Sequence, residues 1–420
     1  MSCSKTPHLV HADSTGQIYD EPELLMLVRR GNELALPRPE EMMPLPESSD
    51  LFLLPDRKAL GLDPETGRVE VMDGLALAGF ASPGHTLCAT AAFAREEAAP
   101  RLPLYAYGAV GYFRDRFWIS AMQVDKDQRQ NFSGFDDKTI TRKARELLAR
   151  YPRNRLISHL AGCALNYCCP AARNLALGRF EAPLPTAREC NAACIGCISY
   201  QPGDSGIQAT QARIDFTPSP AEIKEVMLEH CRKEKRPILS FGQGCEGEPL
   251  TRARKIIQVV QQVRQAVPAA TINMNTNASL PEFIAPLARA GMDSIRVSLN
   301  SAEPEFYSSY YRPRGYSFQD VVSSISEARK HSMFISLNLL YFPGISDTES
   351  QLELLTGLVQ DHRIDFIQMR NMNLDPDIYL ELAGDRAMGP GMGLKNFLSR
   401  LKKECPWINF GYFNPYVDRD

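Results

Sequence analysis

Short apolar segments recur along the chain from about residue 185 onward, and turn-forming residues separate them. Segments of this length, bounded by Gly, Pro, Asn or Ser, predict β-strands. A further short strand is expected to lead into Cys190, which makes six predicted strands in this region. The other five are PILSFG, ATINMN, SIRVSL, FISLNL and DFIQMR, which begin at Pro237, Ala270, Ser294, Phe334 and Asp365.

Helical patterns lie between these strands. Ser219-Pro220-Ala221-Glu222 predicts a helix start, with a capping box and proline at the first helical position. A similar box at Ser279-Leu280-Pro281-Glu282 has its proline one position later, and Gly291 is expected to end that helix. This alternation predicts a parallel α/β sheet, closed or partly closed as a barrel, with its active site at the C-terminal ends of the strands. Apolar stripes support two of the helices: Ile256, Val259, Val260, Val263 and Val267, and Leu352, Leu355, Leu358 and Val359.

The N-terminal third of the chain has a different texture and is rich in Pro and Gly. Its apolar segments, such as LFLL and FWISAMQV, are short and separated by turn residues, which predicts strands and loops. We therefore expect an N-terminal domain of unknown fold over residues 1–155 and a helical connector over residues 156–184. The α/β core is expected over residues 185–376, followed by a C-terminal extension over residues 377–420.

The composition is typical of a soluble globular protein, with 44% hydrophobic and 23% charged residues. A chain of 420 residues exceeds one typical core, so two domains are expected. The net charge of -3 gives no signal for a nucleic-acid partner. The N-terminus lacks the apolar core of a secretory signal, and no apolar run approaches the ~20 residues of a membrane span. These features predict a cytoplasmic protein without a membrane partner.

Three of the 11 cysteines are closely spaced. They are Cys190, Cys194 and Cys197, and their spacing is C-x3-C-x2-C. Thiolates favour zinc, copper(I) and iron–sulfur clusters. A structural zinc site normally has a second pair of ligands. The nearest candidates, His230 and Cys231, lie in a predicted helix far downstream. In a four-iron cluster, three cysteines leave one iron open to an exogenous ligand, which is a catalytic arrangement.

With this spacing on the loop after the first predicted strand, the sequence resembles the radical S-adenosylmethionine (radical SAM) superfamily. The resemblance implies that Cys190, Cys194 and Cys197 hold a [4Fe–4S] cluster whose open iron binds the amino nitrogen and carboxylate of SAM. One electron would cleave SAM, and the resulting 5′-deoxyadenosyl radical would abstract hydrogen from a substrate. The residue before the third cysteine is usually aromatic in this family and packs near the adenine, but here it is Gly196.

The loop after the second predicted strand reads Glu246-Gly247-Glu248-Pro249 and is similar to the family's GGEP motif, with Glu246 in place of the first glycine. The resemblance implies that Glu246, Gly247 and Glu248 bind the amino group of SAM through backbone carbonyls and the acidic side chain. A glycine allows close backbone approach, and a carboxylate complements an ammonium group. The alternative is an ordinary strand-to-helix turn in which a glutamate serves the helix dipole.

Further matches lie at the ends of the following strands. The TNA around Asn277 resembles the family's TNG, and SIRVSL is similar to its RVSLD strand, which implies cofactor-binding roles for Asn277 and Ser298. Ser298 matches a position that contacts the ribose or the carboxylate of SAM, and Arg312 is expected to reach the same carboxylate. Phe342-Pro343-Gly344 resembles an element that packs against adenine. Together the motifs extend from Pro185 to Asn373 in the family's order.

A second group of cysteines lies upstream, in HLAGCALNYCCPAARN. An auxiliary metal site is one interpretation, but a helix with buried thiols is favoured because free Cys is among the most buried residue types. Cys245 is expected to be a small packing residue rather than a thiol that faces the substrate. Only Cys405 follows the predicted barrel, which argues against a SPASM or twitch extension. The auxiliary set would be His159, Cys163, Cys168 and Cys169.

We therefore expect a radical SAM enzyme with a partial (β/α)6 TIM-like barrel and a separate N-terminal domain of strands and loops. Its oxygen-sensitive cluster would take one electron from a donor such as ferredoxin or flavodoxin. The substrate stays open among a peptide, a nucleotide and a small metabolite, and the N-terminal domain is expected to cover the barrel mouth and shape specificity. Two alternatives stay open: a zinc-binding structural module, and a non-catalytic iron–sulfur protein for electron transfer or sensing, with Cys245 as fourth ligand.

Overall fold

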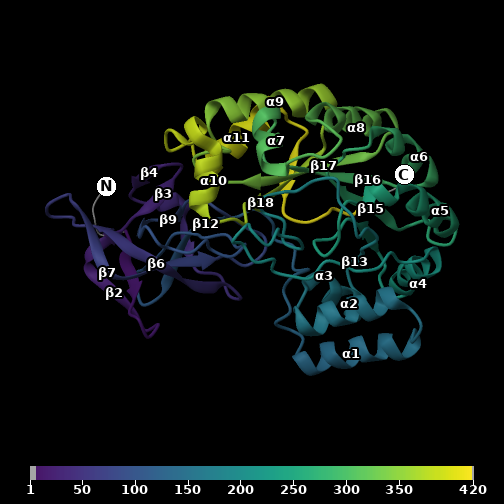
Figure 1. Ribbon diagram of the computed structural model, residues 1–420, viewed down its shortest axis with the longest axis horizontal. Helices are drawn as coiled ribbons and strands as arrows, with labels where there is room; N and C mark the ends of the chain where they lie inside the picture. Colours follow the sequence, from purple (N-terminus) through teal and green to yellow (C-terminus); the bar gives the residue numbers. More distant parts are fainter. Residues whose placement is uncertain (1–5, 419–420) are drawn as a thin grey trace.

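The computed structural model describes residues 6–418 and shows a strand-rich N-terminal part beside a larger α/β part (Figure 1). The N-terminal part consists of a nine-stranded sheet and a three-stranded sheet, and its paired strands are antiparallel. Its strands are β1 (His8–Ala12), β2 (Ile18–Met26), β3 (Val28–Arg30), β4 (Glu33–Ala35), β5 (Met42–Pro44), β6 (Asp50–Leu62), β7 (Val69–Phe80), β8 (His85–Leu87), β9 (Thr90–Ala91), β10 (Phe93–Arg95), β11 (Val110–Tyr112) and β12 (Phe117–Gln123). The long hairpin β6–β7 turns where Asp63 Oδ1 accepts from the N–H of Glu65 at 2.7 Å.

Three helices follow the antiparallel strands: α1 (Asp137–Arg150), α2 (Arg155–Asn166) and α3 (Pro170–Leu177). Asp136 and Asn154 cap α1 and α2 through their side chains, and Gly178 ends α3 in the left-handed conformation. Buried side chains of α2 such as Leu156 and Leu160 join the same apolar core as the α/β part. These helices are therefore packed onto the α/β part rather than onto the antiparallel strands.

The α/β part is built on a seven-stranded sheet whose neighbouring strands follow chain order and are all parallel. The strands are β13 (Glu181–Leu184), β14 (Ile238–Phe241), β15 (Thr271–Thr276), β16 (Ser294–Leu299), β17 (Phe334–Tyr341), β18 (Phe366–Asn371) and β19 (Asn409–Gly411). The strand expected before Cys190 is β13, and the five predicted apolar segments are β14 to β18. The seventh strand, β19, lies outside the six that the apolar pattern predicts.

Helices line the outer side of this sheet (Figure 1). Among residues 6–418, no helix has the length and apolar character that crossing a membrane requires. The helices of this part are α4 (Pro220–Cys231), α5 (Ala253–Arg264), α6 (Ile284–Ala290), α7 (Pro304–Tyr311), α8 (Phe318–Lys330), α9 (Glu349–His362), α10 (Pro376–Ala383) and α11 (Leu394–Glu404).

The two predicted capping boxes have different outcomes. The box at Ser219 is confirmed, since its side chain accepts from the N–H of Glu222 and the Glu222 side chain accepts from the N–H of Ser219. The box at Ser279 is wrong, because a short 3-10 turn over Pro281–Phe283 precedes α6. The Ser279 hydroxyl instead accepts from Asn191 Nδ2 at 2.8 Å. Gly291 ends α6 at φ 108°, as predicted.

Apolar and polar residues alternate along β15 to β18, so the two faces of the sheet differ. One face packs in the apolar core through side chains such as Met274 and Val297, which are fully buried. The opposite face carries polar residues, and some of them hydrogen-bond across the strands, as Ser294 does with Asn273 and Arg296 with Gln368. The polar residues of this face are Asn273, Asn275, Ser294, Arg296, Ser298, Ser336, Asn338, Gln368 and Arg370.

Asn414, just after β19, lies on this polar face. Its Nδ2 donates to Glu181 Oε1 in β13 at 2.7 Å, and its Oδ1 accepts from Gln368 Nε2 in β18 at 2.8 Å. Because one short side chain contacts the first and the sixth strand of the sheet, the sheet is strongly curved around its polar face.

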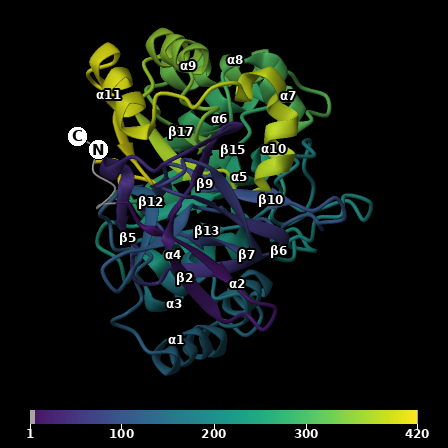
Figure 2. The same cartoon turned by 90° about the vertical axis from the view of Figure 1, so that its left-hand side faces the viewer.

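The N-terminal part is attached to the C-terminal end of β18, and Figure 2 looks onto it with the parallel sheet behind. Thr86 Oγ1 donates to the carbonyl of Met369 at 2.7 Å, and the N–H of Leu87 donates to Asn371 Oδ1 at 2.9 Å. A buried ion pair between Arg57 and Asp375, at 3.0 Å, lies beyond β18. The N-terminal part therefore meets the sheet at the end where active sites of parallel α/β proteins lie.

Candidate functional site

The loop after β13 carries Cys190, Cys194 and Cys197, and the end of α7 holds this loop in place. The N–H of Ala193 donates to the carbonyl of Tyr311 at 3.0 Å, and the N–H of Ile195 donates to the carbonyl of Tyr310 at 3.1 Å. These backbone bonds fix the loop around the second cysteine without using any cysteine side chain.

The three cysteine thiols are half-buried and free of disulfides. Burial raises the pKa of Cys190 to about 11, with Glu248 as the next cause, and it raises the pKa of Cys194 further. Arg213 Nη2 donates to Cys197 Sγ at 3.3 Å. Metal binding displaces the thiol protons. Three thiols on a fixed loop, with a cation beside one of them, fit a cluster held by three cysteines.

Cys245 lies in a group with two residues of α2. Its sulfur lies within 4.8 Å of Cys163 Sγ and of a ring nitrogen of His159. The auxiliary set of His159, Cys163, Cys168 and Cys169, the less favoured of the two interpretations, is only partly brought together: His159 and Cys163 belong to this group, and Cys168 is exposed. The expectation that Cys245 is a small packing residue misses this contact.

The Glu246 carboxylate joins the loop after β13 to the loop after β14. Its Oε2 accepts from the N–H groups of Thr186 and Ala187, at 2.7 and 2.8 Å, and its Oε1 accepts from those of Gly242 and Gln243, both at 2.7 Å. Burial raises the pKa of Glu246 to about 7, and the backbone donors oppose that rise. The side chain is therefore fully engaged by the protein, and its expected contact with SAM stays a prediction.

Gly247 lies where the two loops touch. A Cβ atom at this position would lie 2.0 Å from the carbonyl oxygen of Glu189, the residue before Cys190. The N–H of Gly247 also donates to the carbonyl of Ala187 at 2.7 Å. Glycine is therefore required here by the close approach of the cysteine loop.

Glu248 and Asn277 lie together at the ends of β14 and β15. Glu248 Oε2 accepts from the N–H of Asn277 at 2.8 Å, and its Oε1 accepts from the Thr276 hydroxyl at 2.5 Å. Burial raises the pKa of Glu248 to about 7. Asn277 Nδ2 in turn donates to Asn191 Oδ1 at 2.9 Å, next to Cys190. The structure thus brings Glu248 and Asn277 to the cysteine loop.

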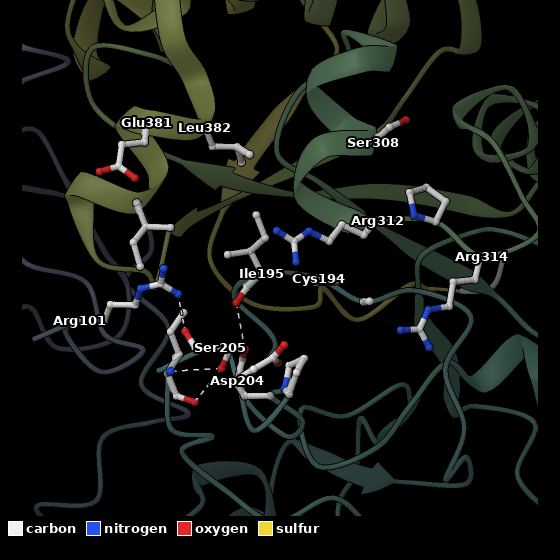
Figure 3. A pocket seen from close by; sticks show the side chains of 16 residues that line it. Arg101, Cys194, Ile195, Asp204, Ser205, Ser308, Arg312, Arg314, Glu381 and Leu382 are labelled. Atoms are coloured by element: carbon white, nitrogen blue, oxygen red, sulfur yellow. Dashed lines mark hydrogen bonds between the residues drawn. The ribbon is translucent and has the colours of Figure 1, made fainter.

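Ser298 and Arg312 occupy different surroundings. Ser298 is half-buried on the polar face of β16, in register with Asn338 of β17. Arg312 ends α7 and lines a cavity of about 930 Å³ behind the cysteine loop. Figure 3 shows its guanidinium pointing into this cavity beside Ile195, with Arg101 on the other side. The predicted contact of Arg312 with the SAM carboxylate stays a prediction.

Tyr310 explains the absence of an aromatic residue at position 196. A Cβ atom on Gly196 would lie 2.5 Å from the Tyr310 hydroxyl oxygen. Tyr310 comes from α7, is buried, and its pKa is raised well above the usual range by that burial. An aromatic ring from another element thus occupies the space beside the third cysteine. Tyr310 is not predicted from the sequence, because its role depends on the packing of α7 against the loop.

A second cavity, of about 320 Å³, lies on the polar face of the sheet and reaches Gly196 and Tyr310. Arg296 and Arg370 both line it. Arg296 Nη1 donates to Gln368 Oε1 at 2.8 Å, and its Nε is buried without a partner among the described residues. Burial, followed by the charge of Arg370, lowers the pKa of Arg296 to about 9. The alternation in IRVS and IQMR is the signal from which these inward arginines were predictable.

Comparisons with known proteins match the part of the chain that carries the cysteine loop. The family model for the radical SAM superfamily matches residues 184–353. A curated protein of Thermococcus kodakarensis, named probable GTP 3′,8-cyclase, is 32% identical over 177 residues, 41% of this chain and 52% of that protein. A GTP 3′,8-cyclase of Petrotoga mobilis is 28% identical over 185 residues, 44% of this chain and 53% of that protein. The chain thus spans about half the length of these relatives.

Among solved structures, the FeFe-hydrogenase maturase HydG from Carboxydothermus hydrogenoformans aligns with 65% of this chain and 70% of its own. The TM-score is 0.40 and the identity 11%. Similarity at this level is too low to transfer structural detail or activity.

Proposed function

We propose that the chain abstracts hydrogen from a phosphate-bearing substrate of the nucleotide class, on the premise that residues 184–353, which match the radical SAM family model, form a radical SAM domain. The observation that carries the substrate class is the pair of arginines, Arg296 and Arg370, on the wall of the inner cavity. The radical SAM domain is the basis for the proposed reaction type, and the two arginines of the cavity are the basis for the proposed anionic substrate.

The cofactors of a radical SAM domain are a [4Fe–4S] cluster and SAM. When bound, the cluster supplies the electron that cleaves SAM to methionine and the 5′-deoxyadenosyl radical. We propose that Cys190, Cys194 and Cys197 hold the cluster. We propose that SAM lies beside them; its predicted protein contacts are Glu246, Gly247, Glu248, Asn277, Ser298 and Arg312.

The residues of this chain hold the cysteine loop in position and exclude water from the space beside it. Glu246 and Gly247 hold the cysteine loop against the end of β14, and Asn191 ties it to Asn277 at the end of β15. The buried ring of Tyr310 closes the space beside Gly196. A reactive radical needs such a site, since contact with solvent would let it react unproductively.

The argument for an anionic substrate is electrostatic. Burial is the main cause of the lowered pKa of Arg296, and repulsion by Arg370, which lines the same cavity, lowers it further. Glu181 also lines the cavity, but Arg129 lies 3.4 Å from its carboxylate. An anion with several oxygen acceptors would offset the repulsion by accepting hydrogen bonds from the guanidinium groups that line the cavity. The relatives named GTP 3′,8-cyclase are named for a nucleoside triphosphate, which has such a group.

The finer architecture is also part of the proposal. We infer that the curved sheet is a partial (β/α)6 TIM-like barrel with β19 added at its edge. We propose domain boundaries near residues 155 and 376. The expected boundary at residue 184 falls at the end of β13 (Glu181–Leu184), the first strand of the sheet, so the core is proposed to begin with that strand. We also propose that the N-terminal domain contributes to the barrel mouth. The electron is proposed to come from a ferredoxin or a flavodoxin, since radical SAM enzymes need a one-electron donor.

The test uses the full chain, purified without oxygen and reconstituted with iron and sulfide. The reduced protein is given SAM and one nucleoside triphosphate at a time, and 5′-deoxyadenosine is measured. The expected result is that one nucleotide raises its formation above the level without substrate, and that deuterium on that nucleotide is transferred to 5′-deoxyadenosine. The Cys194→Ser variant should form none.

Two outcomes would contradict different parts of the proposal. The radical chemistry would be contradicted if the reduced protein formed no 5′-deoxyadenosine and its EPR signal did not change when SAM was added. A protein that forms it equally with a nucleoside triphosphate and with the parent nucleoside would contradict the phosphate-bearing substrate class only.

A further inference from the structure

Three metal-ligating side chains outside the cysteine loop meet at one point. His159 and Cys163 are one turn apart on α2, and Cys245 comes from the loop after β14. One ligand atom of each lies within 4.8 Å of the other two. Within residues 6–418, this is the one such group of histidine, cysteine and carboxylate ligands. Chance burial of thiols accounts for Cys163 on an apolar helix face, but it does not bring a histidine and a distant cysteine to the same place.

The spacing fits a single ion. Tetrahedral zinc, with bonds of about 2.3 Å to sulfur and about 2.0 Å to nitrogen, separates neighbouring ligand atoms by roughly 3.5–3.8 Å. The distance from Cys163 Sγ to His159 Nε2 is 3.6 Å. A four-iron cluster holds its thiolates on different iron atoms and spreads them more widely than one ion does. The chemistry of two cysteines and a histidine is that of zinc sites.

The surroundings of these three side chains bury them and hold them in place. The side chains of Cys163 and Cys245 are 6% and 7% exposed, and the His159 ring packs edge-on against Phe216 at 6.3 Å. Both cysteine backbones are held, since the carbonyl of Cys163 accepts from the N–H of Cys169 at 3.1 Å and that of Cys245 accepts from the N–H of Ile214 at 2.8 Å. The ligands are therefore fixed by structure that does not depend on a metal.

We propose that His159, Cys163 and Cys245 bind one zinc ion, with water as the fourth ligand. No fourth histidine, cysteine or carboxylate of the described chain joins the group. The ion would connect α2 to the loop that continues into Glu246, and so would brace the strand-end loop against the helical segment. This site is separate from the Cys190 loop, and the proposal does not rest on the substrate or on the radical reaction.

The experiment measures zinc and iron separately by elemental analysis in the full chain, purified without oxygen and without added chelator. The wild type is expected to hold about one zinc per chain, in addition to iron in the cysteine-loop cluster. Cys163→Ala and Cys245→Ala should each lose the zinc and keep the iron. Cys231→Ala is the matched control, because Cys231 is a half-buried cysteine outside the group. It should keep both metals.

Cobalt provides a second readout that does not depend on stability. Cobalt-loaded wild type should show the strong visible bands of a tetrahedral site and a thiolate-to-cobalt charge-transfer band, and Cys245→Ala should lose both. Circular dichroism establishes that the variants are folded. Zinc retained in both cysteine variants, no zinc in the wild type after zinc is supplied, or a Cys163–Cys245 disulfide in the anaerobic protein would each overturn the proposal. An iron–sulfur spectrum lost in Cys245→Ala would overturn the assignment to a single ion.

Discussion

The hydroxyl oxygen of Tyr310 lies 2.5 Å from the position that a Cβ atom on Gly196 would occupy. The next nearest atom of the ring, Cζ, lies at 3.4 Å, which is ordinary contact. A Cβ atom at position 196 would therefore clash with a single atom of Tyr310, the hydroxyl oxygen.

This relationship predicts a coupling between two substitutions. Gly196→Ala should lower the free energy of unfolding by about 1–3 kcal/mol, because the buried Tyr310 must move. In a Tyr310→Phe background the same change should cost much less, since the closest atom is gone. Urea unfolding of the four proteins measures the coupling. Equal costs of Gly196→Ala in both backgrounds would show that the hydroxyl does not set the constraint.

Glu246→Gln is expected to destabilise the chain strongly. Both carboxylate oxygens accept from pairs of backbone N–H groups, so the NH2 of a glutamine must face two donors whichever way it turns. Loss of those bonds in a buried place should cost about 3 kcal/mol or more. Glu282→Gln, an exposed position, serves as the control and should be within about 0.5 kcal/mol of the wild type. A glutamine at 246 with wild-type stability would contradict this assignment of the bonds.

Gly247→Ala is predicted to reduce cluster content. The added Cβ would lie 2.0 Å from the carbonyl oxygen of Glu189, so the cysteine loop must shift. Iron and sulfide bound per chain after reconstitution measure the effect, and we expect them to fall well below the wild-type values. Gly203 lies on the same loop, and a Cβ atom at this position would meet no other atom within 4 Å. The control Gly203→Ala should therefore leave the iron content unchanged.

The proposed nucleotide site predicts the effect of removing the charge of Arg296. At pH 7.5 its guanidinium is charged, and it lines the inner cavity together with Arg370. Arg296→Gln should therefore weaken nucleotide binding at pH 7.5 by about 10-fold or more. Equilibrium dialysis with labelled nucleotide measures the affinity.

The matched control for this experiment is Arg254→Gln, an exposed arginine on α5. It should bind the nucleotide as the wild type does. If Arg254→Gln weakens binding as much as Arg296→Gln, general surface charge rather than the inner cavity accounts for the affinity.

The sequence predicted the strands and the order of the motifs because both are local. Apolar segments bounded by turn residues are typical of buried parallel strands, and β14 to β18 follow them. The capping box at Ser219 is local as well and is confirmed, whereas the box at Ser279 failed because its hydroxyl accepts from Asn191 instead. A competing partner from a distant loop is invisible to a pattern of neighbouring residues.

Long-range relationships account for the other misses. Cys245 and Cys163 are far apart in the chain, and only the packing of α2 against the loop after β14 brings them together. Strand β19 is three residues long and carries no apolar run of its own. The polar face with Arg296 was open to prediction, since a strict alternation of polar and apolar residues in a buried parallel sheet indicates a lined interior.

The attachment of the N-terminal part to β18 has a consequence for how specificity can change. Thr86 and Leu87 hydrogen-bond to Met369 and Asn371, the two neighbours of Arg370. The placement of a proposed substrate-binding arginine is thus set in part by residues outside the segment that matches the superfamily. A change in the N-terminal part is therefore expected to move Arg370 without any change in the cysteine loop.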